Sequence, residues 1–157
     1  MKKTVYLDTT IPSYLFDERK SIRAWVDITR KWWDEERQRF DLWISEETFS
    51  ELNAGDYPRK QEVLAFISEI PLLPVVPSVV GIVETYVTNY LMPQTSVSDA
   101  AHLAYASYYK MDFLLTWNCN HLANANKKQH IHIINTRMNL STPEITTPFE
   151  LFTEKQT

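Results

Sequence analysis

Four polar residues with oxygen-bearing side chains lie where a predicted strand gives way to a helix, or within the first turns of that helix. They are Asp8, Glu51, Asp99 and Asn118. A parallel α/β sheet builds its sites at the carboxyl ends of its strands. We therefore expect the three carboxylates and the carboxamide to meet in one opening at that edge of the sheet, which we call the mouth. Their mutual repulsion calls for a cation, and hard oxygen donors favour Mg²⁺ or Mn²⁺ as the cofactor.

The elements that must position these residues follow from apolar runs separated by turn and cap residues. Strands are expected over residues 4–7, 41–45, 72–76, 113–116 and 144–147. Helices are expected at Pro12, over 21–40, after Ser45, after Pro58, over 78–91, from a Ser98 cap to 109, and over 121–135. Pro74 cannot donate to a ladder, so its strand should lie near a sheet edge. Alternating strands and helices predict an α/β protein, a three-layer α/β/α fold with a mostly parallel central sheet.

The length and composition restrict the architecture and the kinds of site. The chain has 157 residues, which predicts one domain over 1–153 followed by a frayed tail at 154–157. It contains only two glycines, too few for a glycine-rich phosphate-binding loop. Cys119 is the only cysteine, which excludes an internal disulfide and a cysteine-based zinc cluster.

The charge and the first residues restrict partners and location. A formal net charge of −4 and a pI near 5.6 argue against tight, metal-free, nonspecific binding of nucleic acid. A nucleic-acid substrate would therefore need local basic patches or a bound metal ion. The first apolar run, residues 4–7, is too short for a signal peptide or a membrane span. We expect a cytoplasmic protein with no membrane partner.

The motifs around the polar residues resemble a known family. They read Tyr6-Leu7-Asp8-Thr9-Thr10, then Glu51-Leu52 with Gly55-Asp56, then Ser98-Asp99-Ala100-Ala101-His102-Leu103-Ala104, then Leu115-Thr116-Trp117-Asn118, and finally Thr147-Pro148-x-x-Leu151. This order resembles the PIN-domain nucleases, particularly the VapC-like toxins of bacterial type II toxin–antitoxin systems. The resemblance covers nearly the whole chain.

The resemblance implies a PIN-like fold and a metal-dependent endoribonuclease, the toxin of a toxin–antitoxin pair. By the family pattern, Asp8, Glu51 and Asp99 carry over as the catalytic, metal-binding acids. A held ion can generate hydroxide from water and neutralise charge on the phosphate. Thr9 or Thr116 is expected to hydrogen-bond a ligand or phosphate. The resemblance also implies RNA as the substrate and an antitoxin that blocks the acidic mouth.

Asn118 departs from the family pattern, in which many members carry Asp in a Thr-x-Asp arrangement. Asn is a neutral oxygen donor, so a second cation would be held more weakly, and Asn also commonly closes turns after strands. The alternative hypothesis is therefore a catalytically weakened PIN-like protein that binds RNA or a protein partner. A phosphohydrolase with an aspartate nucleophile is disfavoured, because Thr10 stands where those enzymes usually carry a second Asp.

Other residues have competing interpretations. Taken singly, Asp8 and Asp99 suit helix N-termini, and Glu51 suits a solvated helix face, although Glu47 four positions earlier repels it unless a positive group lies nearby. His121 is the histidine expected to touch substrate, and His102 is expected to be a packed or surface group. Aromatic-rich helices predict core packing or a subunit contact, and hence a homodimer. The tryptophans concerned are Trp25, Trp32, Trp33 and Trp43.

Overall fold

The computed structural model describes residues 1–153, and its centre is a sheet of five strands. The strands are β1 (Lys3–Leu7), β2 (Phe40–Ser45), β3 (Leu72–Leu73), β4 (Phe113–Leu115) and β5 (Glu144–Thr146). They lie in the order β3-β2-β1-β4-β5, and every neighbouring pair is parallel. The predicted parallel sheet is confirmed. Strand β1 lies at its middle, between β2 and β4, and its apolar residues 5–7 are fully buried.

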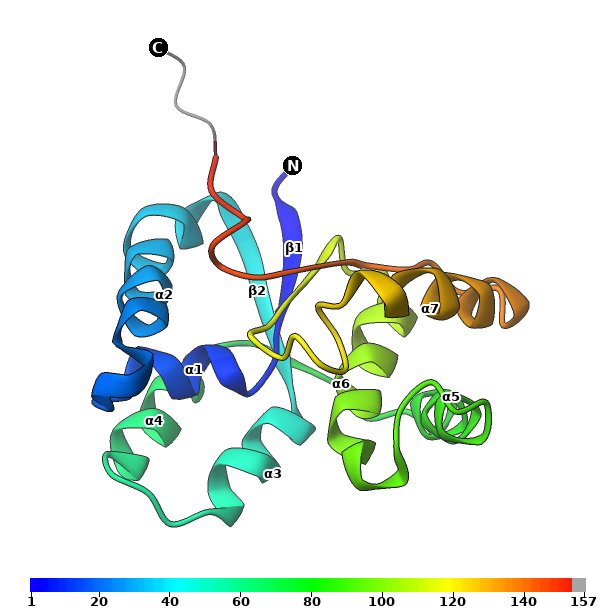
Figure 1. Ribbon diagram of the computed structural model, residues 1–157, viewed down its shortest axis with the longest axis horizontal. Helices are drawn as coiled ribbons and strands as arrows, with labels where there is room; N and C mark the ends of the chain where they lie inside the picture. The colour runs from blue at the N-terminus through cyan, green and yellow to red at the C-terminus, as the bar shows by residue number, and fades with distance from the viewer. Residues whose placement is uncertain (154–157) are drawn as a thin grey trace.

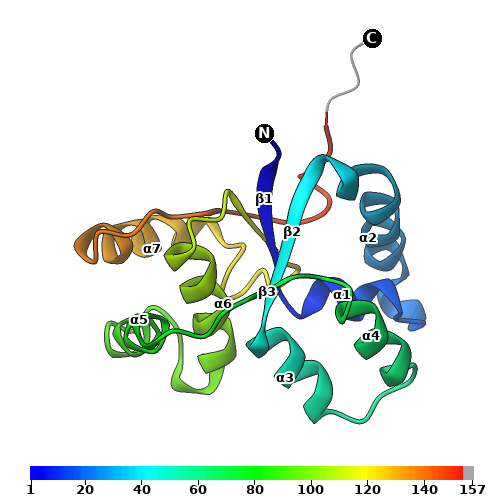
Figure 2. The ribbon, with the colours of Figure 1, turned by 180° about the vertical axis from the view of Figure 1, so that it is seen from behind.

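Helices cover both faces of this sheet, as Figures 1 and 2 show from opposite sides. The α-helices are α1 (Thr10–Leu15), α2 (Arg23–Glu36), α3 (Glu46–Ala54), α4 (Lys60–Ile67), α5 (Pro77–Thr88), α6 (Val97–Tyr108) and α7 (Ala125–Arg137). Short 3₁₀ helices span Lys20–Ile22, Arg37–Arg39 and Gln94–Ser96. None of the helices within residues 1–153 has the length and apolar character needed to cross a membrane.

Strand β1 divides the core into two halves. Side chains of a strand alternate between its faces, so Val5 and Leu7 point to one side and Tyr6 to the other. Val5 and Leu7 pack in a cluster with residues of α1, α2 and α4, whereas Tyr6 packs in a cluster with residues of α5, α6 and α7. Two helical layers with the sheet between them confirm the predicted three-layer α/β/α arrangement.

Several element boundaries differ from the sequence predictions. Strand β3 ends at Leu73 instead of residue 76, immediately before Pro74, although it does lie at the sheet edge. The helix predicted over 21–40 is α2 flanked by two 3₁₀ turns. The tail predicted to be frayed, 154–157, lies outside the described residues.

The helices that flank the candidate site also begin elsewhere than predicted. Helix α6 begins at Val97 and not behind a Ser98 cap, because the Ser98 hydroxyl donates to Glu47 Oε1 at 2.5 Å. Helix α7 begins at Ala125 instead of residue 121, where the Asn124 side chain accepts the backbone N–H of Asn126. Residues 116–124 therefore form a loop beside the mouth.

The tryptophans divide between core and surface. Trp32 is fully buried, and its indole Nε1 donates to the carbonyl oxygen of Leu151 at 2.8 Å, which fastens the end of the described chain to α2. Trp25, on the same helix, is 48% exposed. Core packing is thus confirmed for Trp32, and the exposed Trp25 leaves the predicted subunit contact as a prediction.

Candidate active site at the carboxyl edge of the sheet

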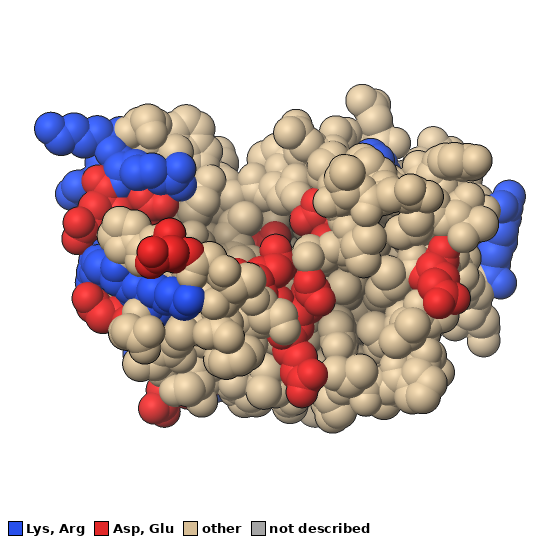
Figure 3. Space-filling view, turned by 90° about the horizontal axis from the view of Figure 1, so that it is seen from below, with Lys and Arg blue, Asp and Glu red and all other residues tan. Residues whose placement is uncertain are grey.

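The predicted acids lie at the carboxyl edge of the sheet, where β1, β2 and β4 end. Asp8 directly follows β1, Glu51 lies on α3 and Asp99 lies in the first turn of α6. Figure 3 views the molecule from this edge and shows acidic side chains running along a hollow, with Lys and Arg at the sides. Among residues 1–153, no ion pair joins any of these three acids to Lys or Arg. The mouth therefore has negative charge that no Lys or Arg of the described chain pairs with directly.

Asp8 is buried and held by hydroxyl groups. It is 2% exposed, and its Oδ1 accepts the backbone N–H of Thr10 at 3.0 Å and the Thr10 hydroxyl at 2.5 Å. Its Oδ2 accepts the hydroxyl of Thr116. Burial raises the pKa of Asp8 above its usual value, and this effect outweighs the charge of His102 and the hydroxyl hydrogen bonds, which act in the opposite direction. Burial thus disfavours the ionised form of this side chain.

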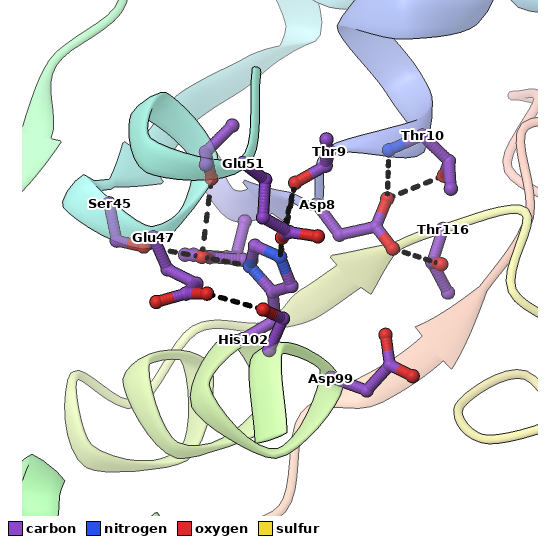
Figure 4. Close-up of polar contacts among 12 residues, drawn as sticks. Asp8, Thr9, Thr10, Ser45, Glu47, Glu51, Asp99, His102 and Thr116 are labelled. Carbon is purple, nitrogen blue, oxygen red and sulfur yellow. Dashed lines mark hydrogen bonds and ion pairs between the residues drawn. The ribbon is translucent and has the colours of Figure 1, made fainter. Parts of the chain in front are cut away.

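Glu51 is held through one carboxylate oxygen. Its Oε1 accepts the Thr9 hydroxyl at 2.6 Å and forms a short contact with His102 Nε2 (Figure 4). Burial alone would raise the pKa of Glu51, but the hydrogen bond and charge of His102 and the bond from Thr9 lower it below the usual value. Glu51 therefore stays ionised.

His102 is the link between Glu51 and the buried interior. The ring is 1% exposed, and its Nδ1 lies 2.6 Å from the hydroxyl oxygen of Tyr6. Burial disfavours a charged ring, but the hydrogen bond to Glu51 and the charges of Asp8, Glu51 and Glu47 prevail and raise the pKa of His102. The sequence predicted a packed or surface group for His102, and packing is confirmed, but its direct contact with Glu51 was missed.

Asp99 lies at the open side of the mouth. Its Oδ2 is 3.0 Å from Nδ1 of His121, which is also 3.2 Å from the Ser96 hydroxyl. Both members of the Asp99–His121 pair are partly exposed. His121 therefore contacts a predicted site acid directly, while its contact with substrate stays a prediction.

Asn118 does not point an unoccupied oxygen at the acids. Its Oδ1 accepts the backbone N–H groups of Asn120 at 3.2 Å and His121 at 3.0 Å. Its own N–H donates to the Thr116 hydroxyl at 2.9 Å. The interpretation of Asn118 as a turn former is thus confirmed.

The two threonines predicted to contact a ligand or phosphate both donate to acids here. Thr9 donates to Glu51, and Thr116 donates to Asp8. Their observed contacts orient the carboxylates of the mouth. Contact with a ligand stays a prediction for both.

The carboxylates suit a hard cation in chemistry but are not assembled as a closed cage. Figure 4 shows Asp8, Glu51 and Asp99 at the same edge of the sheet. Glu51 Oε2 and Asp99 Oδ1 accept no hydrogen bond from residues 1–153, so each is a free oxygen donor. As the side chains stand, the described residues contain no group of three or more His, Cys, Asp or Glu that could hold a metal ion. The donor set fits Mg²⁺ or Mn²⁺ by type, and the metal site stays a prediction.

One signal in the sequence pointed to His102. Glu47 and Glu51 are four residues apart on α3, a like-charge spacing that favours a positive group nearby. His102 is that group, since its ring contacts Glu51 and feels the charge of Glu47. The histidine lies 51 residues further along the chain, so local spacing could not identify it.

Comparison with known proteins gives structural neighbours only. No protein-family model matches the chain, and no curated protein matches it. A chain of a toxin-antitoxin complex from Klebsiella pneumoniae is 20% identical, with a TM-score of 0.56 over 79% of this chain and 94% of that chain.

Two VapBC structures show the same likeness. A chain of VapBC2 from Rickettsia felis, bound to a promoter DNA fragment, is 14% identical with a TM-score of 0.57, over 92% of this chain and 98% of that chain. A chain of VapBC-1 from nontypeable Haemophilus influenzae is 15% identical with a TM-score of 0.57, over 94% and 99%. The chain therefore has the three-layer α/β/α PIN-like fold that its sequence predicts, a fold it shares with these toxin–antitoxin structures.

Proposed function

We propose that this protein is a divalent-metal-dependent endoribonuclease and the toxin of a toxin–antitoxin pair, acting in the cytoplasm. One observation carries the proposal. Asp8, Glu51 and Asp99 come from three separate elements to one edge of the sheet, and no Lys or Arg among residues 1–153 pairs with them. Carboxylates gathered in one place repel one another, and the histidines beside Glu51 and Asp99 are their only ion-pair partners among residues 1–153, so a bound cation would offset the remaining negative charge.

The residues of the mouth divide into donors and supports. Glu51 Oε2, Asp99 Oδ1 and the Asp8 carboxylate would hold Mg²⁺ or Mn²⁺. When bound, such an ion supplies an activated water and neutralises charge on the phosphate. Thr9 and His102 orient Glu51 by occupying its other oxygen.

The charge of the mouth sets a condition for binding of the proposed RNA substrate. RNA phosphates are repelled by uncompensated carboxylates, so productive binding requires the divalent cation. Lys and Arg gather at the outer edges of the face seen in Figure 3, where they would contact RNA phosphates at some distance from the cleaved bond. RNA binding should accordingly be weak without metal.

The proposed partners are an antitoxin and a second copy of this chain. The structural neighbours are toxin–antitoxin complexes, which supports the antitoxin. Trp25 is 48% exposed on α2, a large apolar side chain suited to a protein contact. An antitoxin that covers the mouth would block access of RNA to the acids.

The test is cleavage of RNA by the purified protein with Mg²⁺ or Mn²⁺, compared with Asp8→Asn and Asp99→Asn. Each variant should lose at least about 100-fold in rate, because each removes charge stabilisation from the reacting centre. Circular dichroism confirms that the variants are folded. Asp27→Asn, at an exposed ion pair on α2, is the matched control and should keep full activity. Cleavage that persists in chelator, or that neither acid substitution reduces, contradicts the proposal.

A second candidate function is supported by Asn118. Its side-chain oxygen is engaged by two backbone N–H groups, so it gives the mouth no additional anionic ligand. A protein with a weakened metal site would bind RNA or a protein partner without cleaving. RNA binding without turnover in every divalent metal tried would favour this function over the nuclease.

A further inference from the structure

The loop between β4 and α7 contacts two acids of the mouth through different side chains. We infer that Asn118 is a positioning residue, which builds the turn that seats His121 on Asp99 and thereby orients the Asp99 carboxylate for the cation. This inference rests on the proposed function and names the role of a residue that stands where a metal-binding Asp was expected.

Asn118 is the centre of the turn. Its side-chain oxygen accepts the N–H groups of Asn120 and His121, and its backbone oxygen accepts those of Leu122 at 3.3 Å and Ala123 at 2.8 Å. Four consecutive backbone N–H groups are therefore satisfied by this one residue. The backbone position of His121 depends directly on the Asn118 side chain.

The turn delivers the imidazole to Asp99. A carboxylate only accepts hydrogen bonds, so His121 Nδ1 carries the hydrogen in the 3.0 Å contact with Asp99 Oδ2. The Ser96 hydroxyl oxygen, 3.2 Å from the same nitrogen, is a second acceptor for this N–H and lies directly before α6. With Oδ2 engaged, Asp99 presents Oδ1 as its free oxygen.

The same loop also reaches Asp8. The Thr116 hydroxyl accepts the N–H of Asn118 and donates to Asp8 Oδ2. One loop thus orients Asp8 through Thr116 and Asp99 through His121. Hydrogen bonds of this kind hold ligating carboxylates in register and raise metal affinity.

The geometry argues against Asn118 as a ligand. A carboxamide has one oxygen with two lone pairs, and both accept backbone hydrogen bonds here. Its nitrogen carries no free lone pair for a cation. Direct ligation would require breaking the turn that holds His121.

The experiment measures Mn²⁺ affinity and stoichiometry from the free-ion EPR signal. Asn118→Ala and His121→Ala should each weaken binding about 10-fold or more. The double variant should bind as weakly as the weaker single variant, because both substitutions break one path. His132→Ala, an exposed histidine on α7, is the matched control and should leave affinity unchanged.

The conservative variant separates positioning from ligation. Asn118→Asp keeps an oxygen that accepts both N–H groups, so it should bind one Mn²⁺ per chain with an affinity within about 2-fold of the parent protein. If this variant binds Mn²⁺ 10-fold tighter, or takes up a second ion, position 118 is a ligand position and the inference is wrong. An unchanged affinity in Asn118→Ala overturns it equally.

A metal-free measurement distinguishes failure of this inference from failure of the proposed function. In ¹⁵N-edited NMR spectra, the His121 Nδ1–H signal should be protected by Asp99 in the parent protein and in Asn118→Asp. It should broaden or disappear in Asn118→Ala. If the parent protein takes up no Mn²⁺, the proposed function fails. Loss of the signal in Asn118→Ala alone would still support positioning, and retention in both variants would refute it.

Discussion

Two clusters of polar side chains in this protein differ in whether their members satisfy one another. Between α5, α6 and α7, the Tyr86 hydroxyl donates to Asn135 Oδ1 at 2.6 Å and lies 3.2 Å from the Ser107 hydroxyl. Asn135 Nδ2 donates in turn to the hydroxyls of Ser107 at 3.0 Å and Thr142 at 3.2 Å. This neutral cluster is closed, because its members satisfy one another without charge.

The neutral cluster also keeps its members uncharged. Burial raises the pKa of Tyr86 to about 12, although its bonds to Ser107 and Asn135 oppose the rise. Tyr86 is therefore a neutral donor at every pH the protein would meet. Such a network stabilises the fold and specifies how the helices pack.

The acidic mouth is open where the neutral cluster is closed. Its acids are supported by hydroxyls and histidines, and two carboxylate oxygens accept nothing from the described chain. The raised pKa of Asp8 means that its ionised form is unfavourable in the metal-free protein. The comparison indicates that the neutral cluster stabilises the native state, whereas the buried Asp8 carboxylate lowers stability at neutral pH. Under the proposed function, a bound cation would offset that cost.

The largest effect on stability should come from breaking the neutral cluster. Asn135→Leu keeps the volume but leaves Tyr86 and Ser107 without their partner, which should lower the free energy of unfolding by about 2–3 kcal/mol. Chemical denaturation monitored by circular dichroism measures this loss. Mn²⁺ affinity should be unchanged, since the cluster does not contact the acids. A loss below about 1 kcal/mol would show that the cluster is not closed as described.

The next effect should come from adding the cation. Mn²⁺ or Mg²⁺ at 100 times its Kd should raise the stability of the native protein by about 2.7 kcal/mol. At about 2–4 °C per kcal/mol, this shift is readily measured as a rise in Tm. The shift should be retained in Asn135→Leu and absent in Asp99→Asn. Equal shifts in all three proteins would mean that the ion binds elsewhere.

A smaller effect, of opposite sign, should follow Asp8→Asn without metal. A carboxyl group whose pKa is raised on folding is favourable below its unfolded pKa and loses that advantage as pH rises. Removing the carboxylate should therefore raise Tm near neutral pH and have little effect near pH 4. Thermal unfolding in chelator at both pH values measures the difference. A Tm lower than that of the parent protein at neutral pH would show that Asp8 is not a destabilising charge.

The smallest effect should come from an exposed ion pair that belongs to neither cluster. Arg23 Nε lies 3.1 Å from Asp27 Oδ1 on α2, and both side chains are well exposed. Asp27→Asn should change stability by less than about 0.5 kcal/mol, because solvent screens the pair. The same thermal measurement serves as the baseline for the others. A larger change would mean that surface charges contribute to the differences assigned to the mouth.

Much of the architecture was predictable from the sequence, because it follows from local pattern. The buried run at residues 5–7 and the Pro74 edge signal placed β1 and β3 in the sheet. Some boundaries failed for local reasons, since β3 stops before Pro74 and Asn124 caps α7, but the start of α6 has a tertiary reason. Ser98 was predicted to cap its own helix, but Glu47 on another helix accepts its hydroxyl.

The sequence by itself determined that Asp8 and Glu51 lie at one edge, since parallel strands end together and the helices that follow β1 and β2 start there. Asp99 lies on α6, which follows α5 and a 3₁₀ turn, so its place at that edge is set by how the helices pack. Only the tertiary structure decided how those acids are held. The contact of Glu51 with His102 spans 51 residues, and that of Asp99 with His121 spans 22. Such pairings depend on how α3 packs against α6 and how the loop after β4 turns, and no local periodicity encodes distances between side chains on separate elements.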